Sequence, residues 1–229
     1  MIKAVIFDMY ETLVTLYGVP VYFSAGMAED AGIPLADFHA AWDPTETDRT
    51  LGRITTGEAI AATLRKCGRY TAERAALLYE KRVRFKKEAF GHLHPEILPL
   101  LETLRSRGLR IGLVSNCFSE EAALIRESVL FPYFDAVCLS YEEGIQKPDP
   151  LIFERCLEKL GLAAHECLYV GDGGSHELSA AKTAGMRPVQ AVWYLKEGTT
   201  QPVSRMAEYE QAETPLAVAA LLSTREKAE

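Results

Sequence analysis

Short apolar runs that end in polar side chains recur along the chain and predict buried parallel strands. The first is at residues 3–8, where Ala4-Val5-Ile6-Phe7 is followed by Asp8. Strands of a parallel sheet are covered on both faces, so they form continuous apolar runs rather than alternating patterns. The same pattern predicts four further strands, at 110–116, 136–140, 167–172 and 188–193.

Helical patterns separate these strands from about residue 92 onward. In the segment 95–107, apolar residues recur at helical spacing, Pro95 stands in the first turn and Gly108 follows the last turn. Further helices are predicted at 150–161, 175–185 and 216–227. Such alternation of strand and helix predicts an α/β fold with a doubly wound parallel sheet and helices on both faces.

Residues 17–90 interrupt this alternation with a pattern of helices only. The predicted helices span 21–31, 34–42, 57–67 and 72–89, with proline and glycine between them. We therefore expect a core of residues 1–16 and 91–229 and an all-helical cap domain of residues 17–90 inserted after the first strand. Ligands of open α/β sheets bind at the carboxyl ends of the strands, so an insert there would act as a lid.

The composition of the chain argues against some classes of binding partner. The 229 residues include 25 Lys and Arg against 32 Asp and Glu, a net charge of −7, and 48% are hydrophobic. A packed core is therefore expected, and the acidic balance argues against a nucleic-acid partner. The apolar runs are far shorter than the roughly 20 residues of a spanning helix, so no membrane partner is expected. The basic run 81–87 is typical of a solvated helix face.

Five scattered cysteines show no metal-binding spacing. Asp8 and Glu11 interrupt any apolar segment of a signal peptide at the N-terminus. We therefore expect the cysteines to be free thiols in a reducing cytosol, and the protein to be cytoplasmic. No feature of the sequence indicates an oligomeric state.

Polar and charged residues that could take part in catalysis or binding follow the carboxyl ends of the predicted strands. They lie in four segments, at 8–13, 115–116, 147–150 and 171–177. A carboxylate on a rigid strand end can attack an electrophile and become an ester or an aspartyl-phosphate. A hydroxyl and a lysine can hold the anionic group being transferred, and additional carboxylates complete an oxygen-only site suited to Mg²⁺.

The ordered set of these motifs resembles the haloacid dehalogenase superfamily of hydrolases over nearly the whole chain. The motifs are Asp8…Thr12-Leu13, Ser115-Asn116, Lys147-Pro148 and Gly171-Asp172…Glu177…Ala184-Gly185. The resemblance implies a Rossmann-like core with a mobile helical cap of the first type.

The resemblance also implies roles for single residues. Asp8 would be the nucleophile, and Lys147 would be catalytic and would steady the transferred group. Ser115 and Asn116 would bind the phosphate or other transferred group, although Asn116 can equally shape the turn after its strand. Tyr10 and Thr12 are possible catalytic neighbours. Mg²⁺ would be held by Asp8, the Tyr10 carbonyl and Asp172, with Glu177 as a further metal residue that can orient a bound water.

Three positions depart from the family pattern. Tyr10 stands where the phosphatases of the family carry a second aspartate, the general acid for the leaving alcohol. Tyrosine here resembles the 2-haloacid dehalogenases, which are metal-independent and whose halide leaves without a proton. Gly171-Asp172 nevertheless resembles the magnesium-using branch. Glu11 replaces a usual glycine, and Glu177 replaces the commoner aspartate.

These features predict a hydrolase with a small, anionic substrate. The favoured reading is a Mg²⁺-dependent phosphatase of a phosphorylated metabolite, acting through an aspartyl-phosphate on Asp8. Lost acid catalysis typically costs 10²- to 10⁴-fold, so activity would be slow or favour good leaving groups such as acyl phosphates. The alternatives are a metal-independent 2-haloacid dehalogenase, acting through an ester on Asp8, and a non-catalytic phosphometabolite-binding protein. In the cap, Arg49 or Arg53 can clamp a substrate carboxylate or phosphate.

Overall fold

A six-stranded parallel sheet forms the centre of the larger part of the molecule. The computed structural model describes residues 1–195 and 204–223. The strands are β1 (Ala4–Phe7), β2 (Arg110–Ser115), β3 (Ala136–Leu139), β4 (Cys167–Gly171), β5 (Arg187–Ala191) and β6 (Glu210–Ala212), in the order β3-β2-β1-β4-β5-β6. The chain thus winds outward from β1 in both directions, and the predicted doubly wound, Rossmann-like α/β fold is confirmed.

The strand register brings two predicted site segments together. Phe7 pairs with Leu113 on one side and with Val170 on the other. Asp8 follows Phe7 directly, and Asp172 comes two residues after Val170. Both carboxylates therefore lie at the same edge of the sheet, at the point where the strand order reverses, and this is where ligands of such sheets bind.

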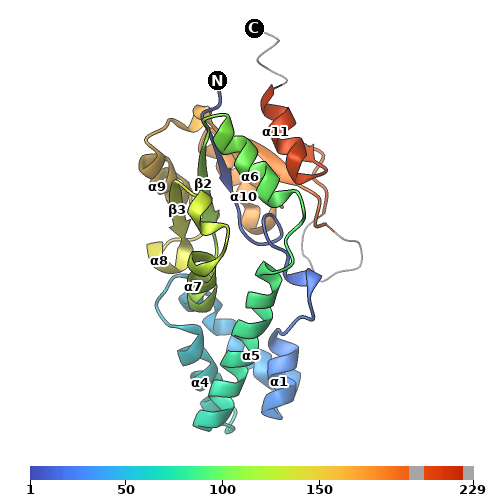
Figure 1. The fold of residues 1–229 in the computed structure, drawn as a ribbon. Coiled ribbons are helices and arrows are strands. Elements are labelled where there is room, and N and C mark those ends of the chain that lie inside the picture. The colour runs from blue at the N-terminus through green and yellow to red at the C-terminus, as the bar shows by residue number, and fades with distance from the viewer. Residues whose placement is uncertain (196–203, 224–229) are drawn as a thin grey trace.

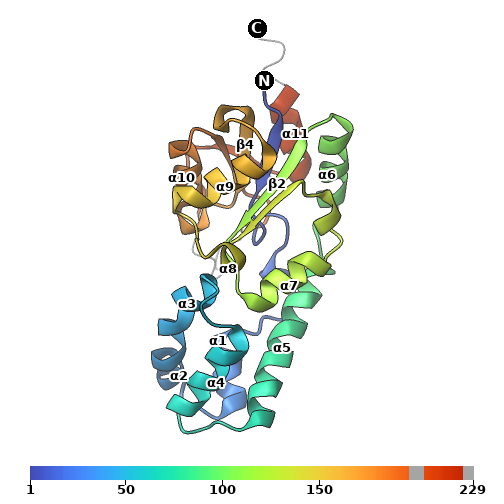
Figure 2. The same ribbon diagram turned by 90° about the vertical axis from the view of Figure 1, so that its left-hand side faces the viewer.

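Helices cover both faces of the sheet (Figures 1 and 2). One face packs against α6 (Ile97–Ser106), α7 (Ser119–Glu127) and α11 (Pro215–Ser223), and the other packs against α9 (Pro150–Leu160) and α10 (Glu177–Thr183). A short helix, α8 (Ser140–Glu143), follows β3. The predicted helix 216–227 is seen as far as Ser223, and its last residues lie outside the described part of the chain.

Between residues 24 and 90 the structure contains helices and no strand. These are α1 (Ser24–Ala31), α2 (Leu35–Trp42), α3 (Glu46–Thr50), α4 (Thr56–Lys66) and α5 (Ala72–Phe90), and they enclose a small apolar core of their own. Figure 2 shows this helical part below the carboxyl edge of the sheet, with α5 reaching up to the core. The cap boundaries at residues 17 and 90 stay a prediction. No helix in the described ranges is long and apolar enough to cross a membrane.

Two features of the sequence fix the ends of the cap helices. Thr55 and Glu58 form a reciprocal capping box at the start of α4, and the Thr71 hydroxyl caps α5. Gly32 ends α1 in the left-handed conformation, with φ of 64°. These caps satisfy backbone groups that helix ends leave unpaired.

A buried group of charges joins the cap to the core, and we call Arg82, Lys86, Glu120 and Glu121 the interdomain cluster. Arg82 Nε lies 2.7 Å and Lys86 Nζ 2.8 Å from Glu120 Oε1, and Lys86 also pairs with Glu121. The side chains of Arg82 and Lys86 are only 6% and 1% exposed, so the prediction of a solvated face for the run 81–87 is wrong for these two residues. Charges buried to this degree need partners, and each helix supplies those of the other.

A close backbone contact adds to the cap–core interface at α3 and α8. Gly52 has φ of 70°, and a Cβ atom built there would lie 2.0 Å from the carbonyl oxygen of Tyr141. Position 52 therefore needs a glycine, both for its conformation and for the approach of the two backbones.

Candidate active site

Asp8 is held at the end of β1 by both its backbone and its side chain. Its N–H donates to the Val170 carbonyl oxygen at 2.9 Å, which continues the strand pairing. Its carboxylate accepts a hydrogen bond from Lys147 Nζ at 2.5 Å. The residue is 6% exposed, and burial raises the pKa of Asp8 to about 7 although the charge of Lys147 opposes the rise.

Lys147 brings a positive charge to the centre of the site. Its ammonium lies 2.5 Å from Asp8 Oδ1 and 2.5 Å from Glu177 Oε2, and it also reaches the Tyr169 hydroxyl oxygen at 3.4 Å. Burial favours the neutral amine, but the two carboxylates outweigh burial and raise the pKa of Lys147 above its usual value. The side chain therefore carries a permanent positive charge beside the predicted nucleophile.

Glu177 is fully engaged by neighbouring donors. Its Oε1 accepts from the Gly173 N–H at 3.1 Å, and its Oε2 accepts from the Tyr169 hydroxyl at 2.8 Å as well as from Lys147. A Cβ atom at position 171 would lie 2.0 Å from Glu177 Oε1, so only Gly171 lets this carboxylate approach the strand. Glu177 therefore gives the Lys147 ammonium a second carboxylate partner besides Asp8.

Asp172 lies beside Asp8 and Glu177, and no residue in the described part of the chain forms an ion pair with it. Its Oδ1 accepts from the Gly174 N–H at 2.8 Å, and the residue is 6% exposed. Burial, followed by the charges of Glu177 and Asp8, raises the pKa of Asp172 to about 8. Two of the three carboxylates thus bind protons more tightly than isolated acids do.

Asp8, Asp172 and Glu177 meet the chemical requirements of a site for a hard divalent cation. Each offers a carboxylate oxygen, and these oxygens all lie within 4.8 Å of one another. Mg²⁺ prefers oxygen donors and commonly takes one or two carboxylates together with waters and substrate oxygens. A cation would stabilise the ionised forms of Asp8 and Asp172, which burial and then the neighbouring acids disfavour, so the residues present fit the metal.

The motif Ser115-Asn116 contributes a buried hydroxyl and an amide that binds the backbone of Lys147. Ser115 is the last residue of β2 and is wholly buried, and its Oγ makes only a long 3.4 Å contact with the Asn116 carbonyl oxygen. Asn116 accepts from the Lys147 N–H at 2.8 Å and donates to the Lys147 carbonyl oxygen at 3.0 Å. Asn116 therefore fixes the backbone of the residue that carries the central ammonium.

Tyr10 and Thr12 lie in the turn after the nucleophile, and each has a polar atom that is buried without a hydrogen-bond partner. The Tyr10 ring packs edge-on against Phe90 of α5, with the ring centroids 6.4 Å apart. Burial and the charge of Glu121 raise the pKa of Tyr10 well above its usual value. The phenol therefore stays protonated, and it faces the interdomain cluster.

Glu11, where the family usually has glycine, adopts the left-handed conformation with φ of 57°. Its carboxylate accepts from the Leu16 N–H at 2.8 Å and from the Thr15 hydroxyl at 2.7 Å. These bonds compensate a backbone conformation that disfavours side chains other than those of Gly, Asn and Asp. The Glu11 carboxylate thus stabilises the loop that follows Asp8.

Sequence reasoning missed two buried polar residues that support the site. Tyr169 on β4 connects Glu177 and Lys147, and Gln190 on β5 donates to the Asp172 carbonyl oxygen at 2.9 Å. Both residues could have been found in the sequence, because each places a polar side chain, a hydroxyl or an amide, within a strand that is otherwise apolar. Such groups need a partner when they are buried.

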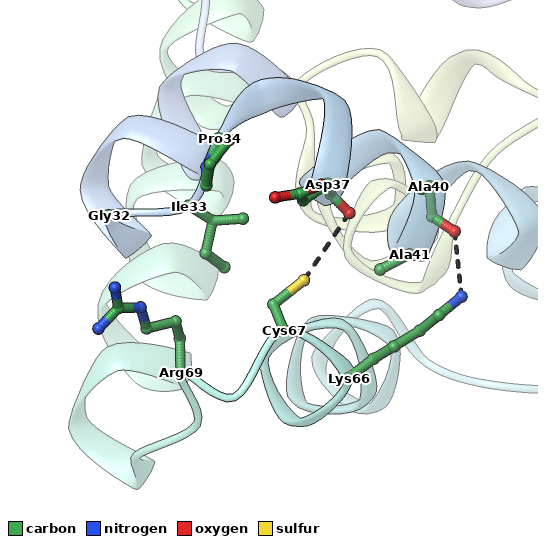
Figure 3. Close-up of a pocket in the computed structure, with 9 residues that line it drawn as sticks. All are labelled: Gly32, Ile33, Pro34, Asp37, Ala40, Ala41, Lys66, Cys67 and Arg69. Carbon is green, nitrogen blue, oxygen red and sulfur yellow. Dashed lines mark hydrogen bonds between the residues drawn. The ribbon is translucent and has the colours of Figure 1, made fainter.

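A depression elsewhere on the cap is unrelated to these residues. It has a volume of about 460 Å³ and lies between the end of α1, α2 and the end of α4 (Figure 3). Its polar contacts are internal, from Lys66 Nζ to the Ala40 carbonyl oxygen and from Cys67 Sγ to the Asp37 carbonyl oxygen. None of the predicted catalytic residues lines it.

Comparisons with known proteins agree with this architecture. The family model of the haloacid dehalogenase-like hydrolases matches residues 2–185. A glyceraldehyde 3-phosphate phosphatase of Methanopyrus kandleri is 33% identical over 106 residues, 45% of this chain and 45% of that protein. The match therefore spans less than half the length of that relative.

Two longer matches cover most of the chain. Phosphatase MT3486 of Mycobacterium tuberculosis is 28% identical over 194 residues, 81% of this chain and 85% of that protein. A 2-haloacid dehalogenase from Pseudomonas syringae pv. Tomato DC3000 has a similar fold, with a TM-score of 0.69 at 22% identity over 97% of this chain and 99% of that chain.

Proposed function

Since the chain belongs to the haloacid dehalogenase-like hydrolase family, we propose that it is a Mg²⁺-dependent phosphatase that acts through an aspartyl-phosphate on Asp8. The observation that carries the proposal is the set of three buried carboxylates, Asp8, Asp172 and Glu177, whose oxygens lie within 4.8 Å of one another. Asp172 is the decisive member, because its carboxylate faces that of Asp8 and completes an oxygen donor set suited to a divalent cation. The similarity to proteins named as phosphatases also supports a phosphatase.

In the proposed reaction the ionised Asp8 carboxylate attacks phosphorus, and the bond from phosphorus to the leaving oxygen breaks. Lys147 and the Ser115 hydroxyl hold the phosphoryl oxygens during this transfer. Water then attacks phosphorus, which releases inorganic phosphate and restores Asp8. Asp8, Asp172 and the Tyr10 carbonyl would hold Mg²⁺, which would supply positive charge to offset the negative charge of the phosphoryl group.

Glu177, Tyr169 and Asn116 act on the reaction through Lys147. Both oxygens of Glu177 already accept hydrogen bonds from the protein, so its part is to orient the ammonium and, through water, the metal site. Asn116 fixes the Lys147 backbone at the same time. The ammonium is thereby pre-organised for an anionic group at Asp8.

The leaving group decides the substrate class within this proposal. No aspartate stands at position 10 to protonate a leaving alcohol, and the raised pKa of Tyr10 makes its phenol a weak acid. Aryl or acyl phosphates, whose leaving groups need no proton, are the favoured substrates.

Tyr10 is also the observation that favours a second candidate, a 2-haloacid dehalogenase. Halide leaves without a proton, and Asp8 would then form an ester with carbon. The test is a panel of aryl phosphates, acyl phosphates and 2-haloacids, each with Mg²⁺ and with chelator. Phosphate release that chelator abolishes supports the phosphatase, and chelator-resistant halide release supports the dehalogenase. Binding of phosphate compounds without turnover of any of them would indicate a non-catalytic protein.

A further inference from the structure

We propose that Gln190, a buried amide in the middle of β5, is a positioning residue for the metal site, because it holds the main chain that carries Asp172. The inference rests on the proposed function in one respect, since it takes Asp172 to be a ligand of Mg²⁺. It concerns a residue outside the four motifs of the sequence. It also adds the segment 204–211 to the parts of the chain that support the site.

Gln190 is a polar residue at a wholly buried position of a strand. Its neighbours Val189 and Ala191 belong to the apolar core that packs against α6 and α11. Since successive side chains of a strand point to opposite faces, the Gln190 amide lies on the face that α10 covers. The backbone of Gln190 pairs with Gly171 of β4, the residue before Asp172. The amide is therefore close to the end of β4, where the metal site begins.

Both ends of the Gln190 amide make hydrogen bonds. Its Nε2 donates to the Asp172 carbonyl oxygen at 2.9 Å and to the Ser204 carbonyl oxygen at 2.8 Å. Its Oε1 accepts from the Met206 N–H at 2.8 Å, and Gln211 Nε2 reaches the same oxygen at 3.4 Å. The reverse orientation would place an oxygen against two carbonyl oxygens, so these partners determine which way the amide points. Gln190 thus links the residue after β4 to the segment before β6.

The bond from Gln190 holds a peptide group that also contacts Glu177. The peptide joins Asp172 to Gly173, and its carbonyl oxygen is the acceptor for Gln190. The N–H of the same peptide, that of Gly173, donates to Glu177 Oε1 at 3.1 Å. Gly173 has φ of 104°, and a glycine leaves the chain free to adopt other conformations unless neighbouring groups restrain it. The two bonds therefore fix the plane of this peptide.

The orientation of this peptide determines where the Asp172 carboxylate lies. The side chain starts from the α-carbon that precedes the peptide, and its carboxylate oxygen lies within 4.8 Å of those of Asp8 and Glu177. Mg²⁺ requires nearly ideal octahedral geometry, so a ligand whose main chain can rotate holds it less tightly. Groups that orient metal ligands typically change metal affinity about 10- to 100-fold when they are removed. Gln190 is such a group for Asp172.

The test measures the Kd for Mg²⁺ by calorimetry in the wild type, in Gln190→Met and in the matched control Val189→Ala. Methionine keeps the length of the side chain but has no N–H group, so Gln190→Met should weaken binding about 10- to 100-fold. Val189→Ala lies in the same strand and points to the other face. It should lower the thermal stability and keep the wild-type Kd. If Gln190→Met does not fold, Gln190→Asn replaces it, because an amide one methylene shorter cannot reach both Asp172 and Met206.

A double-mutant cycle shows whether Gln190 acts through Asp172. The Kd for Mg²⁺ is measured in Asp172→Asn, with and without the substitution at position 190. Since the proposed ligand is already lost in Asp172→Asn, the effect of Gln190→Met should shrink there to less than about threefold. A merely structural role of Gln190 would give the same effect in both backgrounds.

The outcomes separate the positioning role from the proposed function. A folded variant at position 190 with the wild-type Kd, an equal loss in Val189→Ala, or an undiminished loss in Asp172→Asn would refute the positioning role. Mg²⁺ binding that depends on Gln190, in a protein that hydrolyses no aryl or acyl phosphate, would refute the phosphatase and leave the positioning role standing. A wild type that binds no Mg²⁺ would refute both.

Discussion

Magnesium binding to this site should release protons, and its affinity should rise steeply with pH. The perturbation is a change of pH from 6 to 9 in the metal-free protein. Without the cation, the pKa of Asp8 is about 7 and that of Asp172 about 8, against an ordinary value of 3.8 for both. Mg²⁺ binds the ionised carboxylates, so it must displace the protons that these groups hold.

The two pKa values set the size of the effect. At pH 6 both acids are mostly protonated, whereas at pH 9 both are mostly ionised. Between pH 6 and pH 8 the apparent affinity should therefore rise on the order of 100- to 1,000-fold, and it should level off above pH 8. Binding at pH 7 should release about one to two protons per ion.

The raised pKa values of Asp8 and Asp172 also determine whether the stability of the folded protein rises or falls with pH. Between pH 4 and pH 8 the native state holds protons at Asp8 and Asp172 that the unfolded chain has lost. The stability contributed by these groups is therefore greatest at low pH and declines as the pH rises through 7 and 8. Mg²⁺ should restore it most strongly above pH 8.

Calorimetry in two buffers with different enthalpies of ionisation measures the protons released. Asp172→Asn is the control, because it removes one of the two titrating acids and should leave at most one proton to be released. Affinity independent of pH between 6 and 8, with no proton release, would refute the reasoning.

Three further outcomes are expected. Asp8→Asn should abolish turnover while its thermal unfolding stays close to that of the wild type, because the amide keeps the shape of the side chain and removes the nucleophile. Glu120→Gln should lower the free energy of unfolding in urea by about 3–5 kcal/mol, since it leaves buried cations short of an anion, whereas Glu142→Gln at a surface pair should cost about 0–1 kcal/mol. Equal losses would contradict the role of burial. Tyr169→Phe should lower kcat about tenfold with little change in KM, because it removes the 2.8 Å bond to Glu177. An unchanged kcat would show that Tyr169 is only structural.

The fold was largely predictable from apolar runs, because strands buried on both faces leave a strong signal. The elements that escaped prediction depend on distant partners. β6 has three residues and only Ala212 is buried. α7 reads as polar, since Glu120 and Glu121 precede its apolar residues, and their burial is possible only because α5 supplies Arg82 and Lys86.

The site was predictable where the chemistry lies directly at strand ends, as for Asp8 and Asp172. The supporting residues were not, because their roles depend on side-chain length and direction. Tyr169 lies within a strand, and its hydroxyl reaches Glu177 only because Gly171 leaves room for that acid. For Asn116, the sequence could not distinguish a turn residue from a ligand, whereas the structure shows it holding the Lys147 backbone.

In the proposed Mg²⁺-dependent reaction, Asp8 becomes phosphorylated. The most direct measurement is rapid acid quenching of the enzyme with an aryl or acyl phosphate, borohydride reduction of any acyl phosphate, and mass spectrometry of the peptide that contains residue 8. We expect reduction at Asp8 when Mg²⁺ is present and none with chelator. Phosphate release without modification of Asp8, or a chelator-resistant adduct on Asp8 formed from a 2-haloacid, would contradict it.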